Sequence, residues 1–208
     1  MPKFLPLFPL KLVVYPGENL NLHIFEPRYV QLIRDVMQKN SGFGIPVYLD
    51  GRIEEYGTEM KILSIEKTYE DGKMDIRTQG KGVIRVLEFL REVPGKLYPA
   101  GIVSEIETDT GVRLNTQLFA FFHKLHQLLG TKPVLNKREY DLRSYDFAHF
   151  VGMSLEEKYH MLTMIDERER QNFLLAHLKS SLPLLEEAEK LKEKIRLNGH
   201  FRKEISPE

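Results

Sequence analysis

Residues 58–79, TEMKILSIEKTYEDGKMDIRTQ, decide the fold of this chain. Side chains alternate in character from Met60 to Lys67, which is typical of a β-strand. Asp71 and Gly72 follow, and this pair favours a tight turn because Gly adopts the positive φ that a two-residue hairpin needs. The stretch therefore predicts two long antiparallel strands, at 58–69 and 73–79, joined by a turn.

The rest of the first half adds further strands and one helix. Segments rich in Ile, Val, Tyr and Phe lie at 43–49, 83–92 and 98–107, and the opening residues 1–15 are typical of an extended strand. Apolar residues recur at helical spacing over 26–39, where Pro27 suits the first position of a helix. Several short strands with a single helix favour an antiparallel barrel or a strongly curled sheet.

The second half changes from strands to helices. The sequence predicts one helix capped by Thr116 and a short one that starts at Ser144. Ser154 and Glu157 have the spacing of a capping box, and a long helical pattern follows, in which Pro183 predicts a kink or a restart. We expect an α+β chain with a β-rich subdomain at 1–108, a helical subdomain at 112–200 and a tail at 201–208.

Composition narrows the classes of function. Lys and Arg number 30 and Asp and Glu number 30, so no net charge attracts a nucleic-acid backbone. The chain has no cysteine, which excludes disulfides, thiolate nucleophiles and metal sites built on Cys. Pro6, Pro9 and Lys11 interrupt the apolar opening, which is too short to span a membrane. We therefore expect a cytoplasmic protein that has no membrane partner.

The glycine pair at 80 and 82 does not form a phosphate-binding loop. Asp75 stands where such a loop needs its first Gly, and Gly82 stands where it needs Ser or Thr. We expect Gly80, Lys81 and Gly82 to form a flexible entry into the next strand. In addition, no Ser lies in the Gly-x-Ser-x-Gly elbow of a hydrolase.

The histidines of the second half form no complete metal site. His123 and His126 lie three residues apart, and His160 follows Glu156 by four, so each pair could share a helix face. Neither pair has the spacing of a metalloprotease or an evident third ligand. The sequence thus predicts no enzyme, with no catalytic residue, cofactor or metal, although a metallohydrolase that uses these histidines is left as a third hypothesis.

Several stretches share the pattern of one known family. They are LPLFPL at 5–10, VVYPG at 13–17, LNLHIFEPRY at 20–29, YGTEMKI at 56–62, GKGVIRV at 80–86, FAHFVG at 147–152 and SLEEK at 154–158. Over residues 4–180, the chain resembles the N-terminal substrate-recognition domain of the Lon protease family. The resemblance implies a PUA-like β-barrel with one inserted helix, followed by a helical bundle, in agreement with the pattern of the two halves.

The resemblance also implies a function. A complete Lon protease continues with an ATPase module and a Ser-Lys protease domain, and neither follows up to Glu208, so we expect a stand-alone recognition module. The leading hypothesis is a non-catalytic module that binds unfolded segments or partner proteins without ATP. Phe25, Tyr29, Phe43 and Tyr48 are the residues expected to line its exposed apolar groove.

Other functions and partners stay open at this point. The alternative is an RNA-binding PUA-like module, because related barrels bind RNA, although the zero net charge opposes it. The sequence does not decide whether the module delivers substrates to a separate protease. Nor does it decide whether the last helix forms a homo-oligomer.

Overall fold

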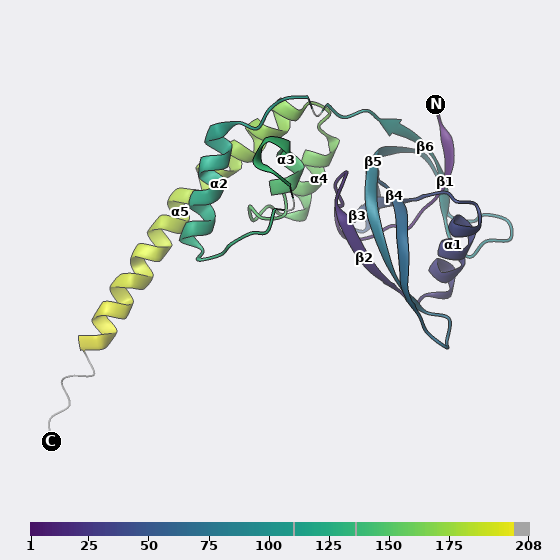
Figure 1. Cartoon of the computed structure of the whole chain (residues 1–208), viewed down its shortest axis with the longest axis horizontal. Helices are drawn as coiled ribbons and strands as arrows, with labels where there is room; N and C mark the ends of the chain where they lie inside the picture. Colours follow the sequence, from purple (N-terminus) through teal and green to yellow (C-terminus); the bar gives the residue numbers. More distant parts are fainter. Residues whose placement is uncertain (110, 136, 202–208) are drawn as a thin grey trace, which may run out of the picture. The chain divides into compact units, whose positions relative to one another are not determined.

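The structure is a computed structural model that describes residues 1–109, 111–135 and 137–201, with side chains up to residue 196. Its contacts divide the chain into two compact units, which Figure 1 shows in sequence colours. We call residues 1–111 and 153–167 the barrel unit, and residues 112–152 and 168–208 the helical unit. Phe201 ends the last helix, and the remainder of the expected tail lies outside the described residues.

The barrel unit holds the strands, one inserted helix and one helix from later in the chain. In chain order these elements are β1 (Lys3–Pro6), β2 (Asn19–Ile24), α1 (Pro27–Gln38), β3 (Phe43–Leu49), β4 (Arg52–Thr68), β5 (Met74–Leu90), β6 (Ala100–Ile106) and α4 (Leu155–Thr163). The sequence predicted all of these strands in part, except β2.

The β4–β5 hairpin is the frame of the barrel unit. Its turn lies at the predicted place but is longer than the predicted two-residue turn. The Tyr69 amide donates to the Lys73 carbonyl at 2.9 Å across a loop of Glu70, Asp71 and Gly72, in which Gly72 alone has a positive φ, of 84°. Each strand is 17 residues long, so β5 continues where the sequence predicted a flexible break. That prediction is wrong, because Gly80 lies within β5 where the segment around Tyr15 crosses the strand. The Tyr15 carbonyl lies too close to the Gly80 Cα for any Cβ to fit there.

The sheet closes on itself through the residues that follow β1. The strand order is β1-β6-β5-β4-β3, and β2 pairs with β5 outside this order. Leu7 and Leu10 then pair in parallel with Gly44 and Val47 of β3, and the Phe8 amide donates to the Gly44 carbonyl at 2.8 Å. This pairing joins the two ends of the strand order, so the expected antiparallel barrel of an α+β fold is confirmed.

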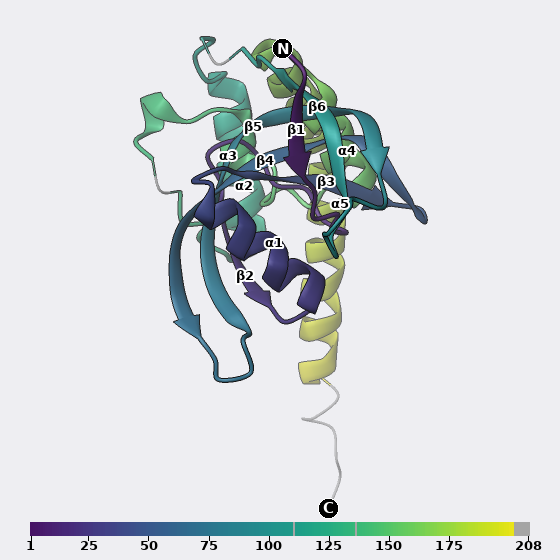
Figure 2. The ribbon, with the colours of Figure 1, turned by 90° about the vertical axis from the view of Figure 1, so that its right-hand side faces the viewer.

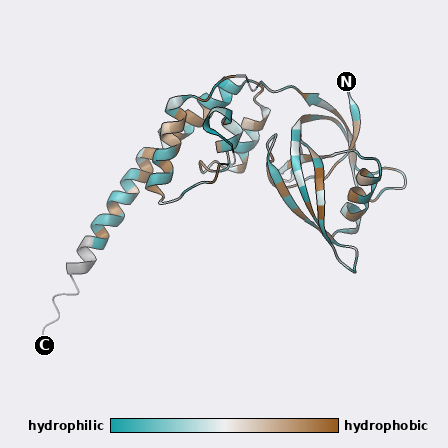
Figure 3. Ribbon diagram, in the orientation of Figure 1, coloured by the Kyte–Doolittle hydropathy of each residue, from teal (hydrophilic) through white to brown (hydrophobic). Residues whose placement is uncertain are grey.

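Helix α1 supplies one side of the barrel core. The sequence predicted it at 26–39, and it begins at Pro27, whose fixed φ suits this position. Figure 2 shows α1 beside β2 and the β4–β5 hairpin. Along those strands, hydrophobic and hydrophilic residues alternate (Figure 3), as strands with one buried face require. The buried residues of α1 that join this core are Tyr29, Leu32, Ile33 and Val36.

Helix α4 packs with the barrel although it comes late in the chain. The predicted capping box is present: the Glu157 amide donates to Ser154 Oγ at 3.1 Å, and the Ser154 amide donates to Glu157 Oε2 at 2.7 Å. Tyr15 Oη then donates to the Lys158 carbonyl at 3.0 Å. These contacts place residues 153–167 in the barrel unit rather than with the other helices.

The helical unit is built from α2 (Thr116–Leu128), a 3₁₀ turn (Glu139–Asp141), α3 (Ser144–Phe147) and α5 (Glu167–Phe201). The cap of α2 is Asn115 rather than the predicted Thr116, because the Asn115 side chain accepts from two amides of the first turn. Pro183 does not restart the helix, and α5 continues through it. Buried residues of this unit include Leu118, Phe122, Leu125, Phe147, Leu174 and Leu178.

Candidate functional site

The four aromatic residues predicted to line a groove separate into two pairs. Tyr29 is 5% exposed and Phe43 is fully buried, and the ring of Phe8 stacks on Tyr29 with centroids 3.7 Å apart. These two residues belong to the core and present no surface to a ligand. Phe25 is 58% exposed and Tyr48 is 39% exposed, so both lie on the surface.

Phe25 and Tyr48 occupy different parts of that surface. Tyr48 is on β3, which pairs with β4, whereas Phe25 directly follows the last residue of β2, which pairs with β5. Two strands therefore separate their elements in the sheet. Within the described residues the two rings are not in contact, so we build the candidate site around Phe25 alone.

Phe25 is the outer member of a group of rings that we call the β2 cluster: His23, Phe25, Tyr69 and the carboxylate of Asp75. The His23 ring lies 6.0 Å from the Phe25 ring and nearly parallel to it, and 5.7 Å from the Tyr69 ring, edge to face. Asp75 joins the group, because His23 Nδ1 donates to one of its oxygens at 2.6 Å and Tyr69 Oη to the other at 2.8 Å.

The register of three strands assembles the β2 cluster. His23 of β2 and Lys67 of β4 both pair with Asp75 of β5, on either side of it. Residues directly opposite in an antiparallel pair point to the same face, so the three side chains form one row. The Lys67 ammonium lies 4.3 Å from the centre of the Tyr69 ring.

The hydrogen bonds of the cluster set the protonation states of Asp75 and Tyr69. They lower the pKa of Asp75, mainly through His23 and then through Tyr69. The same carboxylate raises the pKa of Tyr69, because the hydroxyl donates to it. At neutral pH the cluster therefore has an ionised carboxylate and a neutral phenol, which fixes the orientation of His23 beneath Phe25.

Strand β2 also has an unpaired edge. Within the described residues, β2 pairs with β5 alone, so the backbone groups of its other side have no strand partner. Leu22 pairs with Ile76, which in turn pairs with Ile65 of β4. Ile65 is 38% exposed, so this apolar row extends from the core to the surface. An exposed edge with an apolar row behind it is a surface on which an extended chain can add as a further strand.

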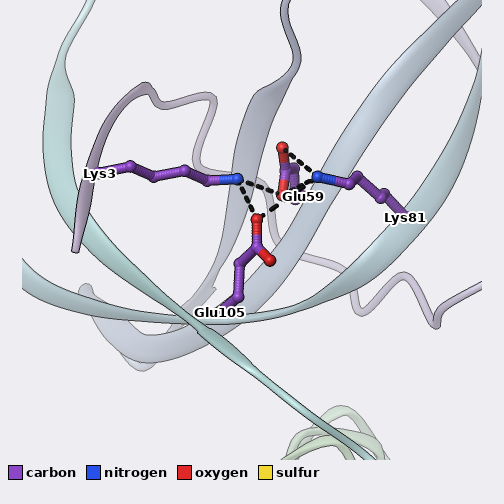
Figure 4. Close-up of polar contacts among 4 residues, drawn as sticks. All are labelled: Lys3, Glu59, Lys81 and Glu105. Atoms are coloured by element: carbon purple, nitrogen blue, oxygen red, sulfur yellow. Dashed lines mark hydrogen bonds and ion pairs between the residues drawn. The ribbon is translucent and has the colours of Figure 1, made fainter. Parts of the chain in front are cut away.

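A second polar group, shown in Figure 4, joins four strands of the barrel. Lys3 Nζ donates to Glu59 Oε2 at 2.8 Å and to Glu105, while Lys81 Nζ lies 3.3 Å from Glu59. Glu59 is only 5% exposed. Burial lowers the pKa of Lys3, but the hydrogen bonds to Glu105 and Glu59 outweigh it and raise that pKa. Two positive and two negative charges balance here, which indicates a structural role in the barrel.

The structure offers no metal site in the part that it describes. Across residues 1–109, 111–135 and 137–196, no three His, Asp or Glu side chains are grouped as a metal ion requires. His123 lies edge to face against Phe119, with centroids 4.4 Å apart, and His126 Nδ1 bonds Thr131 Oγ1 at 2.7 Å.

Among the helices described, none combines the length and the apolar character that a membrane span demands.

Sequence reasoning did not find most of the β2 cluster. Strand β2 was not predicted, so His23 had no assigned neighbours, and Asp75 was considered only as a mismatch in a phosphate-loop motif. The turn at Asp71 and Gly72 indicated the hairpin but not its register. A two-residue turn there would pair Asp75 with Thr68, whereas the longer loop of the structure pairs it with Lys67.

Comparisons with known proteins agree with this architecture. Residues 4–180 match the family described as the ATP-dependent protease La (LON) substrate-binding domain. A Lon protease of Dictyoglomus thermophilum is 26% identical over 94% of this chain, and the match covers 27% of that protein. Protein cereblon of Xenopus tropicalis is 27% identical over 44% of this chain and 22% of its own length. The chain thus spans about a quarter of the length of the curated relatives that it matches.

A solved structure supports the same assignment. The Lon N-terminal domain protein from Xanthomonas campestris is 29% identical, with a TM-score of 0.67 over 84% of this chain and 98% of that one. The N-terminal domain of the Mycobacterium avium complex Lon protease has the same fold, with a TM-score of 0.61 at 15% identity. Since the family match covers most of the 208 residues, the chain belongs to the Lon substrate-binding domain family.

Proposed function

We propose that this chain is a non-catalytic module that binds unfolded polypeptide segments, including those of partner proteins, and that the binding requires no ATP. The observation that carries the proposal is the unpaired edge of β2 directly beside the exposed ring of Phe25. Membership of a substrate-binding family supports it.

The chemistry of the site suits unfolded chains in particular. A strand edge binds an extended chain through main-chain hydrogen bonds, which every sequence except proline can form. Specificity is then limited to what Phe25 contacts, and an aromatic ring favours apolar side chains. Since the hydrogen bonds of Asp75 fix His23, the Phe25 ring has a rigid neighbour to stack on.

Fluorescence anisotropy of labelled unfolded peptides, titrated with the protein in the absence of nucleotide, tests the proposal. We expect saturable binding that Phe25→Ala weakens about tenfold, or about 1.4 kcal/mol, as loss of an aromatic anchor does. Phe4→Ala is the matched control, because Phe4 is 51% exposed on β1, away from the site. Equal affinity of the two variants would contradict the role of Phe25.

A second experiment tests strand addition itself. In a strand pair, the amides of alternate residues point toward the partner. A peptide methylated on one alternate set of backbone nitrogens should lose binding, while the same peptide methylated on the other set should retain most of it. Equal loss with both sets would show that the peptide is not bound as a strand.

Salt separates this proposal from RNA binding. Because the net charge of the chain is zero, we expect peptide affinity to change little between low and high salt. We also expect the same peptide affinity with and without ATP, since the proposed binding requires no nucleotide. Affinity for RNA that falls steeply with salt would favour the nucleic-acid alternative instead.

We propose a separate protease as the partner that receives bound segments, since the relatives include Lon proteases.

A further inference from the structure

Helix α5 has a second apolar face beyond the one that packs inside the helical unit. Leu178 and Leu182 are buried, and the face that they define continues along α5 toward α2, where Lys124 pairs with Glu186. At 100° per residue, positions 184, 188, 191 and 195 fall on another side of the helix, roughly 100–160° around it from Leu178 and Leu182. Figure 3 shows hydrophobic residues interspersed with hydrophilic ones along α5.

We call Leu184, Ala188, Leu191 and Ile195 the α5 seam. The three larger side chains are 68%, 59% and 63% exposed, and no residue within the described part of the chain covers them. Their spacings of four, three and four residues are those of the a and d positions of a coiled coil. A seam of this kind is stable in water when another helix covers it.

The seam is complementary to itself when two copies run in opposite directions. With the helices antiparallel, Leu184 lies opposite Ile195 of the second copy, and the small Ala188 lies opposite the large Leu191. Each layer of the helix pair is therefore filled by apolar side chains without a void. Glu187 and Lys194 flank the seam on the same side. The antiparallel arrangement brings Glu187 of each copy against Lys194 of the other.

The parallel arrangement fits less well. It would place Ala188 against Ala188 and leave a void in the seam. It would also direct Glu187 at Lys192, which already forms an ion pair with Glu189 at 2.5 Å. Among the residues that the structure describes, neither Glu187 nor Lys194 forms an ion pair, so both are available to a second copy.

We propose that two copies of this chain associate through the α5 seam as an antiparallel helix pair, held by four apolar layers and two Glu187–Lys194 ion pairs. The inference does not depend on the proposed function, because it uses residues of the helical unit only. Such a dimer would carry two copies of the β2 cluster.

Sedimentation equilibrium of the full chain tests the association. We expect a mass near twice 24.3 kDa at tens of micromolar, with dissociation on dilution. Leu191→Asp should give the single-chain mass, with a circular dichroism spectrum unchanged because Leu191 is exposed. Leu97→Asp is the matched control, since Leu97 is 64% exposed in the barrel unit, and it should leave the dimer intact. A wild-type chain that stays monomeric at these concentrations overturns the proposal.

A charge exchange tests the direction of the helices without altering the apolar layers. Glu187→Lys should weaken association at least tenfold, because it places like charges against Lys194 on both sides of the seam. Adding Lys194→Glu should restore the original affinity, since the pairs form again with reversed signs. Failure of the double variant to recover would overturn the antiparallel arrangement.

Discussion

Among single residues, Glu59 is the carboxylate on which two lysines of the barrel converge. It is 5% exposed, whereas Lys3 and Lys81 are partly exposed to solvent. Glu59→Gln keeps the shape of the side chain and removes its charge, so the two ammonium groups lose their shared partner. We expect the free energy of unfolding to fall by about 2 kcal/mol, less than for a fully buried pair, because water reaches both lysines.

Urea unfolding at neutral pH measures this change. Glu55→Gln is the control, because Glu55 pairs with Arg85 on the exposed outer surface and should leave the urea midpoint where it is. An unchanged midpoint for Glu59→Gln would show that the two lysines are satisfied by solvent and by Glu105.

Residue type alone could not tell which aromatic side chains reach the surface. The helical spacing of 26–39 contained part of the answer: Tyr29 is in phase with Leu32, Ile33 and Val36, so it had to face the core with them. Phe25 precedes the helix and follows β2, and no periodic pattern includes it. Its exposure depends on how the chain passes from strand to helix, which is a tertiary property.

At the scale of elements, the two glycines of β5 differ in how closely the rest of the chain approaches them. A Cβ on Gly80 would collide with the Tyr15 carbonyl, whereas a Cβ on Gly82 would meet no atom within 4 Å. Gly80→Ala must therefore displace the crossing chain, and we expect a loss of roughly 1–3 kcal/mol in the free energy of unfolding. Gly82→Ala, two residues further along the same strand, should be neutral or slightly stabilising.

Thermal and urea unfolding of the two variants provide the comparison. Similar stabilities would mean that the crossing chain yields to the added methyl group, and that Gly80 is dispensable. The sequence identified the glycines correctly as special but assigned them to a break, because a close approach by a segment 65 residues earlier leaves no local signal.

Strand β2 shows a second limit at the scale of elements. Its alternation of Leu20, Leu22 and Ile24 with polar residues is six residues long, which is short for an assignment from the sequence alone. The long hairpin was predictable because a turn pair lies between two strand patterns, although the register of its strands was not. By contrast, β2 exists as a strand because β5 is there to pair with it.

At the scale of the whole molecule, we expect the helical unit to lose stability in acid through one histidine. His126 lies in the helical unit, and its burial among aromatic rings lowers its pKa below the usual 6.5 more than the Phe150 backbone raises it. The unfolded chain then binds this proton more tightly than the native state does. The contribution of His126 to stability is thus complete above about pH 6.5 and is lost as the pH falls below that value.

Thermal unfolding from pH 7.5 to 5 measures this loss, and His126→Asn isolates it. The variant keeps a side chain that can hydrogen-bond Thr131 but has no titrating ring, so its stability should depend less on pH than that of the wild type. Parallel pH curves for the two proteins would assign the acid response to other groups.

The division of the molecule was only partly visible in the sequence. The change from strands to helices near residue 108 marks the end of β6, but α4 lies beyond it and still packs with the barrel unit. Its capping box predicted where it starts and not what it packs against. Contacts such as that of Tyr15 with Lys158 join residues far apart in the chain, and local patterns do not encode them.

The closing of the barrel has a consequence for its synthesis. Lys3 of β1 pairs with Val103 of β6, so about 100 residues must follow the first strand before its partner exists. At elongation rates of about 5 to 20 residues per second, the ribosome needs roughly 5 to 20 s to supply them. During that interval Phe4, Leu5, Leu7 and Phe8 leave the exit tunnel with no sheet to join, and the nascent barrel is itself an unfolded apolar segment of the kind that chaperones hold.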